Sequence, residues 1–125
     1  MTEQYGDPTT AHFWEAARRH ELVVQRCEAC DRRQFYPRPF CLGCLGRDLS
    51  WVQVSGRAVV YAQTTNRLAV LPELEPPYVV ALVDLEEGPR LLTNIVGDPV
   101  AIGERVVLDW RERADAPPLP VFRRG

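Results

Sequence analysis

The sequence predicts a mainly β protein, with a short N-terminal helix, a small four-cysteine unit and a five-stranded barrel in that order. Three observations carry this prediction. Residues 9–20 have apolar side chains at helical spacing, all four cysteines fall between positions 27 and 44, and runs of β-branched and aromatic residues fill much of the remainder. We therefore divide the chain into an N-terminal helix (1–21), a cysteine unit (22–49) and a barrel domain (50–125).

The first segment, residues 9–20, is predicted as an amphipathic helix with Thr9 or Thr10 as its N-cap. Phe13 begins an apolar stripe that continues through two alanines one turn later, and Trp14 lies beside it. A helix of this length is marginal in isolation. We expect Phe13 and Trp14 to dock it, either on the rest of this chain or on a partner subunit.

The cysteines form two pairs, Cys27 with Cys30 and Cys41 with Cys44, in the pattern C-x2-C-x10-C-x2-C. The two-residue gap lets both thiolates of a pair face one ion, and two such pairs complete a tetrahedral four-sulfur site. The pattern predicts a zinc ribbon, with iron in the same cage as the chemical alternative. Redox disulfides or free thiols are less favoured, because neither pair lies at a strand-to-helix junction. Four protein sulfurs leave no open coordination position, so the metal is expected to be structural.

The flanking segments, residues 22–26 and 33–36, are predicted as a short hairpin around the first cysteine pair. This unit has too few apolar residues to build its own core, so a metal is expected to supply the missing cohesion.

The third segment is predicted as a small antiparallel barrel, because strand-length apolar runs alternate with glycine and proline and no long helix intervenes. Gly56 marks a bulge or bend, Glu86–Pro89 a hairpin turn, 67–77 a long loop, and 117–124 a proline-rich tail. The five predicted strands are residues 51–54, 58–62, 78–85, 90–96 and 106–110.

The charge pattern argues against a general polyanion binder. All 15 basic residues are arginines, against 17 acids, for a formal charge of −2. Four thiolates and one Zn²⁺ together carry −2, which would take this total to −4. We therefore expect no nucleic-acid partner. No apolar run approaches the roughly 20 residues that cross a bilayer and the first residues are polar, so we expect no membrane association and a cytoplasmic location.

Candidate catalytic groups are few. His12 and His20 lie in or near the helix, where a surface or interface role is expected, and no cysteine, glycine-rich phosphate loop or G-x-S-x-G motif remains as catalytic machinery. No catalytic residue is therefore predicted. The arginines around the cysteine pairs suit either a solvated face around an anionic cluster or contact with a ligand or partner: Arg26, Arg32, Arg33, Arg38 and Arg47.

The local motifs together resemble an acyl-CoA-associated family that joins a rubredoxin-like zinc ribbon to an OB fold, long labelled a domain of unknown function. The resemblance spans nearly the whole chain, although Asp31 and Leu45 stand where such ribbons usually place glycine. The matching segments are Gln25-Arg26-Cys27-x-x-Cys30, Pro37-Arg38-x-x-Cys41-x-x-Cys44, Trp51-x-x-Val54-Ser55-Gly56-Arg57, Pro77-Tyr78-Val79-Val80-Ala81, Glu87-Gly88-x-Arg90-Leu91-Leu92-Thr93-Asn94, Ile102-Gly103-x-x-Val106 and Leu119-Pro120-x-Phe122-Arg123.

The resemblance implies an accessory subunit that accompanies a thiolase-superfamily enzyme, such as a lipid-transfer-protein-type thiolase or aldolase, or a hot-dog-fold enoyl-CoA hydratase. Such a subunit would support the partner's active site and share its CoA thioester, including thioesters of steroid side chains. Arginines near the junction between ribbon and barrel, Arg38, Arg57 and Arg67, are the candidate contacts for CoA phosphates or the partner. The rival interpretation from another class is a module that binds single-stranded nucleic acid, since ribbons and OB folds both serve that purpose. The third is an independent enzyme that turns over acyl-CoA substrates.

Overall fold

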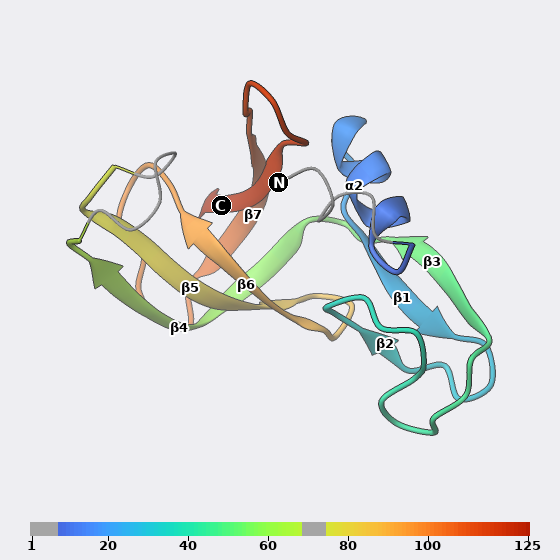
Figure 1. Cartoon of the computed structure of the whole chain (residues 1–125). Helices are drawn as coiled ribbons and strands as arrows, with labels where there is room; N and C mark the ends of the chain where they lie inside the picture. The colour runs from blue at the N-terminus through green and yellow to red at the C-terminus, as the bar shows by residue number, and fades with distance from the viewer. Residues whose placement is uncertain (1–7, 69–74) are drawn as a thin grey trace.

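The computed structural model describes residues 8–68 and 75–125. One helix, a three-stranded sheet of order β2-β1-β3 and a closed barrel of order β4-β5-β6-β8-β7 follow one another along the chain (Figure 1). The mainly β class and the five-stranded, OB-like barrel are confirmed. The elements are α2 (Ala11–Arg18), β1 (Val23–Cys27), β2 (Arg33–Gln34), β3 (Leu49–Gln53), β4 (Arg57–Asn66), β5 (Tyr78–Leu85), β6 (Arg90–Ile95), β7 (Arg105–Arg111) and β8 (Leu119–Arg124).

Helix α2 begins after Thr10, the N-cap, and ends at Arg18, two residues before the left-handed residue His20, with φ of 59°. Phe13 and Trp14 are 2% and 7% exposed, and both belong to the core that the chain's own strands complete. Of the two docking partners expected for this aromatic pair, the structure therefore provides the rest of the chain. None of the described helices has the length and apolar character needed to cross a bilayer.

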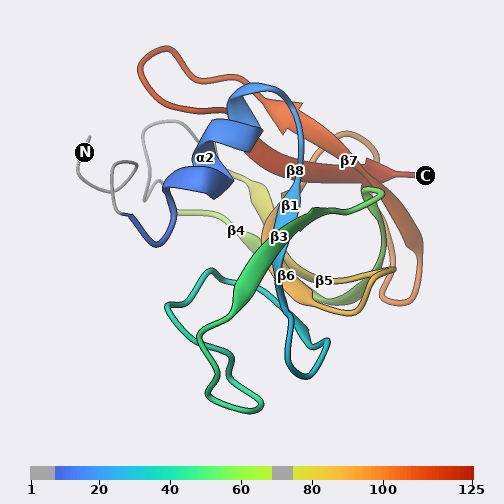
Figure 2. The ribbon, with the colours of Figure 1, turned by 90° about the vertical axis from the view of Figure 1, so that its right-hand side faces the viewer.

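The sheet beside the helix is centred on β1, which pairs antiparallel with β2 through Gln25↔Gln34 and with β3 from Val23↔Gln53 to Cys27↔Leu49. The prediction that residues 51–54 form the first barrel strand is therefore wrong. Strand patterns show which residues are extended but not which strand they pair with, and here the loop after Cys44 returns the chain to β1. In Figure 2, β3 lies directly beside β1.

The barrel is closed by β8, which lies in the segment predicted to be a proline-rich tail. That prediction is wrong, because β8 pairs antiparallel with β7 from Arg111↔Leu119 to Val106↔Arg124 and buries Val121 and Phe122. Pro120 fits in the strand because a single missing N–H leaves the neighbouring pairs intact.

The structure locates the predicted bend or bulge near Gly56 and the predicted turn at residues 86–89. Gly56, with φ of 88°, makes a bend between β3 and β4, and the bulge that shifts the β4–β5 register lies between Val60 and Ala62. The turn at 86–89 is confirmed, since the Leu85 N–H donates to the Pro89 carbonyl at 2.9 Å. Of the predicted loop 67–77, residues 69–74 lie outside the described residues.

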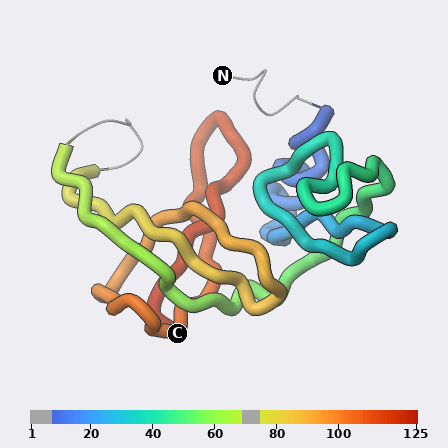
Figure 3. Tube along the Cα trace, turned by 90° about the horizontal axis from the view of Figure 1, so that it is seen from below, coloured from blue at the N-terminus to red at the C-terminus, as the bar shows by residue number. Residues whose placement is uncertain are grey.

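One apolar cluster joins the helix, β1 and the barrel, so the two sheets share a core. The tube in Figure 3 shows the N-terminal elements and the barrel as neighbouring units, with the green segment between β3 and β4 crossing between them. At the helix end, the His20 ring stacks on Trp110 at 5.4 Å and its Nε2 lies 2.6 Å from Glu112 Oε2. His12 stacks on Trp51 at 4.9 Å. Both histidines thus tie the helix to neighbouring strands.

Candidate functional site

The two cysteine pairs sit in turns with the same hydrogen bonds. In the first turn, the Asp31 N–H donates to the Cys27 carbonyl at 2.8 Å and the Cys27 N–H donates to Arg32 O at 2.8 Å. In the second, the Leu45 N–H donates to Cys41 O at 2.9 Å and the Cys41 N–H donates to Gly46 O at 2.7 Å. The repeated geometry turns both cysteines of each pair toward one point.

The residues that replace the usual glycines take the conformation that glycine would supply. Asp31 and Leu45 both have φ of 65°, in the left-handed region. Such a conformation costs roughly 1–2 kcal/mol for a residue with a side chain. The departure from the ribbon pattern therefore leaves the turns intact.

The four sulfur atoms fit a four-coordinate metal. Cys27 Sγ lies 3.6 Å from Cys44 Sγ, Cys30 Sγ lies 3.6 Å from Cys41 Sγ, and all four lie within 4.8 Å of one another. A disulfide would place two sulfurs about 2.05 Å apart, whereas a tetrahedron with Zn–S bonds of about 2.3 Å places them about 3.8 Å apart. The cysteines are free thiols, at separations that a single ion would bridge.

Backbone dipoles favour a thiolate within this cluster. The N–H groups of Cys44 and Gly43 donate to Cys41 Sγ at 3.5 and 3.3 Å, and they lower the pKa of that thiol to about 6. The Arg32 N–H lowers the pKa of Cys30, but hydrogen bonding with the other three cysteines and burial outweigh it and raise that pKa to about 12. A metal ligand must be deprotonated, so a bound ion would take the place of the proton on Cys30.

The charged residues around the first pair neutralise each other. Arg26 forms ion pairs with Asp31 and Glu28, and its hydrogen bond to Asp31 holds the pKa of that carboxyl below its usual value. Arg33 lies 3.9 Å from the same carboxylate. Of the five arginines expected around the cysteines, Arg26 and Arg33 therefore form part of the ribbon's own surface.

Two buried glutamines hold the second cysteine pair in place. Gln25 and Gln34 are each 4% exposed and paired across β1 and β2, where the Gln34 amide donates to Gln25 Oε1 at 2.9 Å. Gln25 also bonds the backbone N–H and carbonyl of Arg38, each at 2.8 Å, while Gln34 accepts the Leu42 N–H at 3.0 Å. The sequence reading missed both residues, although a glutamine among the valines of a buried strand is itself an indication of a satisfied polar network.

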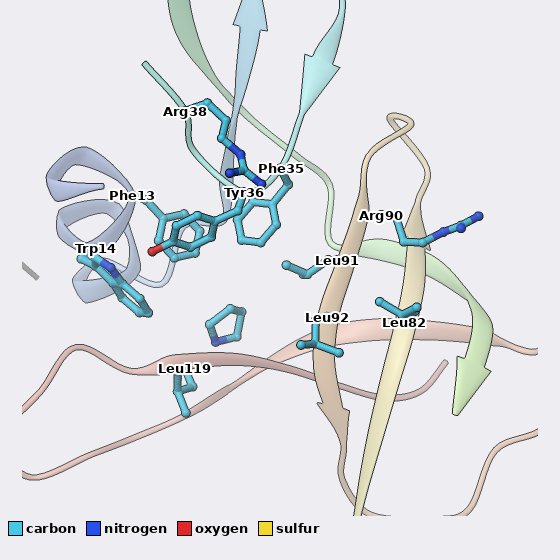
Figure 4. A pocket seen from close by; sticks show the side chains of 11 residues that line it. Phe13, Trp14, Phe35, Tyr36, Arg38, Leu82, Arg90, Leu91, Leu92 and Leu119 are labelled. Atoms are coloured by element: carbon cyan, nitrogen blue, oxygen red, sulfur yellow. The ribbon is translucent and has the colours of Figure 1, made fainter. Parts of the chain in front are cut away.

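An apolar groove of about 480 Å³ separates the ribbon from the barrel. The helix and the segment after β2 form one wall, and β5, β6 and the start of β8 form the other (Figure 4). We call it the β6 groove. It is lined by Phe13, Trp14, Phe35, Tyr36, Arg38, Leu82, Arg90, Leu91, Leu92, Leu119 and Pro120.

The three arginines proposed to meet CoA phosphates or a partner are not brought together. Arg38 lines the β6 groove, whereas Arg57 begins β4 and gives its guanidinium to Glu86 in two bonds of 2.8 and 2.9 Å. Arg67 follows the other end of β4, roughly 30 Å along a strand of that length. The expectation that Arg67 lies near the junction is wrong, because β4 carries it away.

Family comparisons match the chain in two consecutive parts. Residues 14–50 match the model described as "ChsH2, rubredoxin-like zinc ribbon domain", and residues 51–111 match "ChsH2, C-terminal OB-fold domain". Among solved structures, a chain of the "Ltp2-ChsH2(DUF35) aldolase" is similar with a TM-score of 0.86 and 42% identity, covering 94% of this chain and 95% of that one.

Two of the curated relatives are described as hydratase alpha subunits. A probable enoyl-CoA hydratase alpha subunit from Thermomonospora curvata is 46% identical over 89% of this chain and 36% of its own length. A 3-oxo-4,17-pregnadiene-20-carboxyl-CoA hydratase alpha subunit from Mycobacterium tuberculosis is 37% identical over 75% of this chain and 31% of its own length. The chain therefore spans about a third of the length of these two relatives.

Proposed function

This chain belongs to the ChsH2 (DUF35) family of zinc-ribbon and OB-fold proteins, and from that premise we propose that it is a non-catalytic accessory subunit of a lipid-transfer-protein-type aldolase or thiolase. The substrate class is a bulky acyl-CoA, such as the thioester of a steroid side chain. The observation that carries the proposal is the match, over 94% of this chain and 95% of the other, to a chain of an aldolase whose name includes both Ltp2 and ChsH2.

The metal in this proposal is Zn²⁺, and its role is structural. The four ligands would be Cys27, Cys30, Cys41 and Cys44, whose separations fit a tetrahedral ion. Such an ion would hold the two turns together where the apolar core is thin, and it offers no open position to a substrate. Elemental analysis that finds iron in place of zinc would contradict the choice of metal and leave the ribbon unchanged.

The CoA thioester enters the proposal as a ligand shared with the partner. Arg38 and Arg67 are the candidates to contact CoA or the partner itself, because neither has a carboxylate of residues 8–68 or 75–125 within 4.0 Å of its guanidinium. Arg57 is the weaker candidate, since its guanidinium already donates two hydrogen bonds to the Glu86 carboxylate. The expected compartment is the cytoplasm, where four cysteine thiols remain reduced and available to a metal.

A second candidate partner is an enoyl-CoA hydratase. The hydratase alpha subunits named above favour it, because a segment similar to this chain forms about a third of each. A shared CoA thioester is common to both candidates, so the enzyme that binds this chain distinguishes them.

Coexpression tests the proposal. We expect this chain to elute from size exclusion as a stable complex with a lipid-transfer-protein-type thiolase encoded in the same genome, and to raise the partner's aldolase or thiolase activity on acyl-CoA. A complex formed only with the hydratase would select the second candidate. Absence of both complexes, together with salt-dependent micromolar binding of a single-stranded oligonucleotide, would favour the nucleic-acid module instead. Turnover of acyl-CoA by the chain alone would contradict an accessory role.

A further inference from the structure

The β6 groove lies where the strand pairing that closes the barrel is shortest. Strand β6 pairs with β5 along its whole length, from Asp84↔Arg90 to Val79↔Ile95, but it pairs with β8 only at Ile95↔Phe122. Before that point the two strands separate. The Thr93 hydroxyl donates to the Pro120 carbonyl at 2.9 Å at the base of the opening.

The edge of β6, and not one of its faces, borders the groove. Successive side chains of a strand point to opposite faces, so a surface on one face would include every second residue. Here the consecutive residues Arg90, Leu91 and Leu92 all line the groove. An unpaired strand edge bordered by apolar side chains is suited to an extended peptide, which adds main-chain hydrogen bonds to the sheet.

Apolar side chains continue from the groove onto the outside of the barrel. Leu92 is 66% exposed and lies opposite Leu82, which in turn lies opposite Ala62, so the three form one row across β6, β5 and β4. Tyr36 is also exposed on the opposite wall. Large exposed apolar side chains gathered in a groove are typical of a surface that another chain covers.

The arginines at the rim of the β6 groove indicate which charge its occupant should carry. Arg90 is neutralised by Asp84, at 2.6 Å, and its guanidinium carbon stacks 3.4 Å from the centre of the Tyr61 ring. Figure 4 shows it extending away from the groove's aromatic side chains, Phe13, Trp14, Phe35 and Tyr36. Arg38 lines the groove and has no carboxylate of the described residues within ion-pair distance. An occupant with a carboxylate near Arg38 would complete the site.

We propose that the β6 groove receives an extended segment of the partner enzyme subunit. The segment pairs with the open edge of β6, buries apolar side chains against Leu82 and Leu92, and places an acidic side chain at Arg38. This inference rests on the proposed function, because it locates the surface through which that function is exercised.

Leu92 and Ile102, two exposed aliphatic residues, provide a matched pair of positions for substitution. Leu92 lies in the groove at 66% exposure, and Ile102 lies outside it at 65%. Because both side chains are largely exposed, Leu92→Arg and Ile102→Arg should leave the fold intact, as circular dichroism would verify. We expect Leu92→Arg to weaken binding to the coexpressed thiolase-type subunit at least about tenfold, since it buries an unpaired charge, and Ile102→Arg to bind as the wild type does.

Arg38→Glu is the second variant, with Arg47→Glu, elsewhere on the ribbon, as its control. We expect only Arg38→Glu to weaken binding, also by at least about tenfold, because two carboxylates would face each other. Hydrogen exchange on the wild-type complex should slow in residues 90–95 and stay unchanged in residues 98–104.

The outcomes test the groove assignment and the proposed function separately. If the wild-type complex forms and Leu92→Arg and Arg38→Glu bind as their controls do, the groove assignment is wrong and the proposed function stands. If no wild-type complex forms, both are wrong. If the chain alone is a dimer that Leu92→Arg converts to a monomer, the groove belongs to a second copy of this chain and the assignment to an enzyme segment is overturned.

Discussion

Replacing Gly56 with alanine tests whether the bend between ribbon and barrel depends on a missing side chain. A Cβ built at this position would lie 2.8 Å from Leu108 Cβ and 3.3 Å from Leu108 Cδ2. The Leu108 N–H also donates to the Gly56 carbonyl at 2.8 Å, so the two backbones are held together. The crowded atom is next to the backbone, and a rotamer change of Leu108 cannot move it.

The structure provides a control with nearly the same φ. Gly103 has φ of 89°, against 88° at Gly56, and a Cβ there would meet nothing within 4 Å. Gly103→Ala should therefore cost only the left-handed conformation, about 1 kcal/mol. Gly56→Ala should cost that amount plus an overpacking penalty of about 1–3 kcal/mol, so about 2–4 kcal/mol in all.

Urea unfolding of the metal-loaded protein, followed by tryptophan fluorescence and circular dichroism, measures both values. A loss of about 2–4 kcal/mol is a large share of the roughly 5–15 kcal/mol that stabilises a typical domain. If Gly56→Ala and Gly103→Ala lower the free energy of unfolding equally, the close approach to Leu108 costs nothing. The bend would then need only a left-handed residue, contrary to this reasoning.

Three further predictions concern the ribbon and the surface ion pairs. Cys41→Ser should reduce the bound zinc from about one per chain and destabilise the ribbon, because metal binding and folding are coupled there; elemental analysis and chelator titration check this, and a metal-free chain that remains fully folded would contradict it. Gln34→Leu should lower the free energy of unfolding by about 1–3 kcal/mol, since it leaves buried partners unsatisfied; thermal melts in excess zinc measure it, and an unchanged melting temperature would show that the amide network is dispensable. Arg57 holds the pKa of Glu86 below its usual value through a side-chain hydrogen bond, so this pair contributes stability above about pH 4, the unfolded pKa, and loses it as the pH falls through the lower folded value. The stability difference between wild type and Glu86→Gln should therefore shrink between pH 5 and pH 3 in urea titrations, and a constant difference would refute the assignment.

Local chemistry explains which features of the ribbon could be predicted. The two-residue gap within each cysteine pair determines where both sulfurs point, and the hairpin between the pairs needs only short-range contacts. Asp31 and Leu45 show the limit of such patterns, because their left-handed conformation is imposed by the turns around the cysteines and not by their own preferences. The surrounding fold therefore offsets the free-energy cost of the left-handed conformation at these two residues.

The two wrong predictions, for residues 51–54 and for the C-terminal segment, both concern which strands pair. The apolar pattern identified residues 51–54 as extended, but a strand's periodicity is the same whichever neighbour it has, and β3 pairs with β1 outside the barrel. The prolines at positions 117, 118 and 120 concealed β8, since composition alone does not show that β7 supplies its partners. The pair Val121-Phe122, a β-branched residue followed by an aromatic one, was the indication of a strand in the sequence, and the structure shows that both are buried.

The sequence by itself determined the four-sulfur site, the β class and the family, because these depend on residue types at fixed spacing along the chain. The tertiary structure decided which strands close the barrel, that Arg38 stands apart from Arg57 and Arg67, and that an open strand edge faces an apolar groove. The walls of that groove come from residues as distant as Phe13 and Pro120. Contacts between such distant residues follow from the packing of whole elements, which no local pattern encodes.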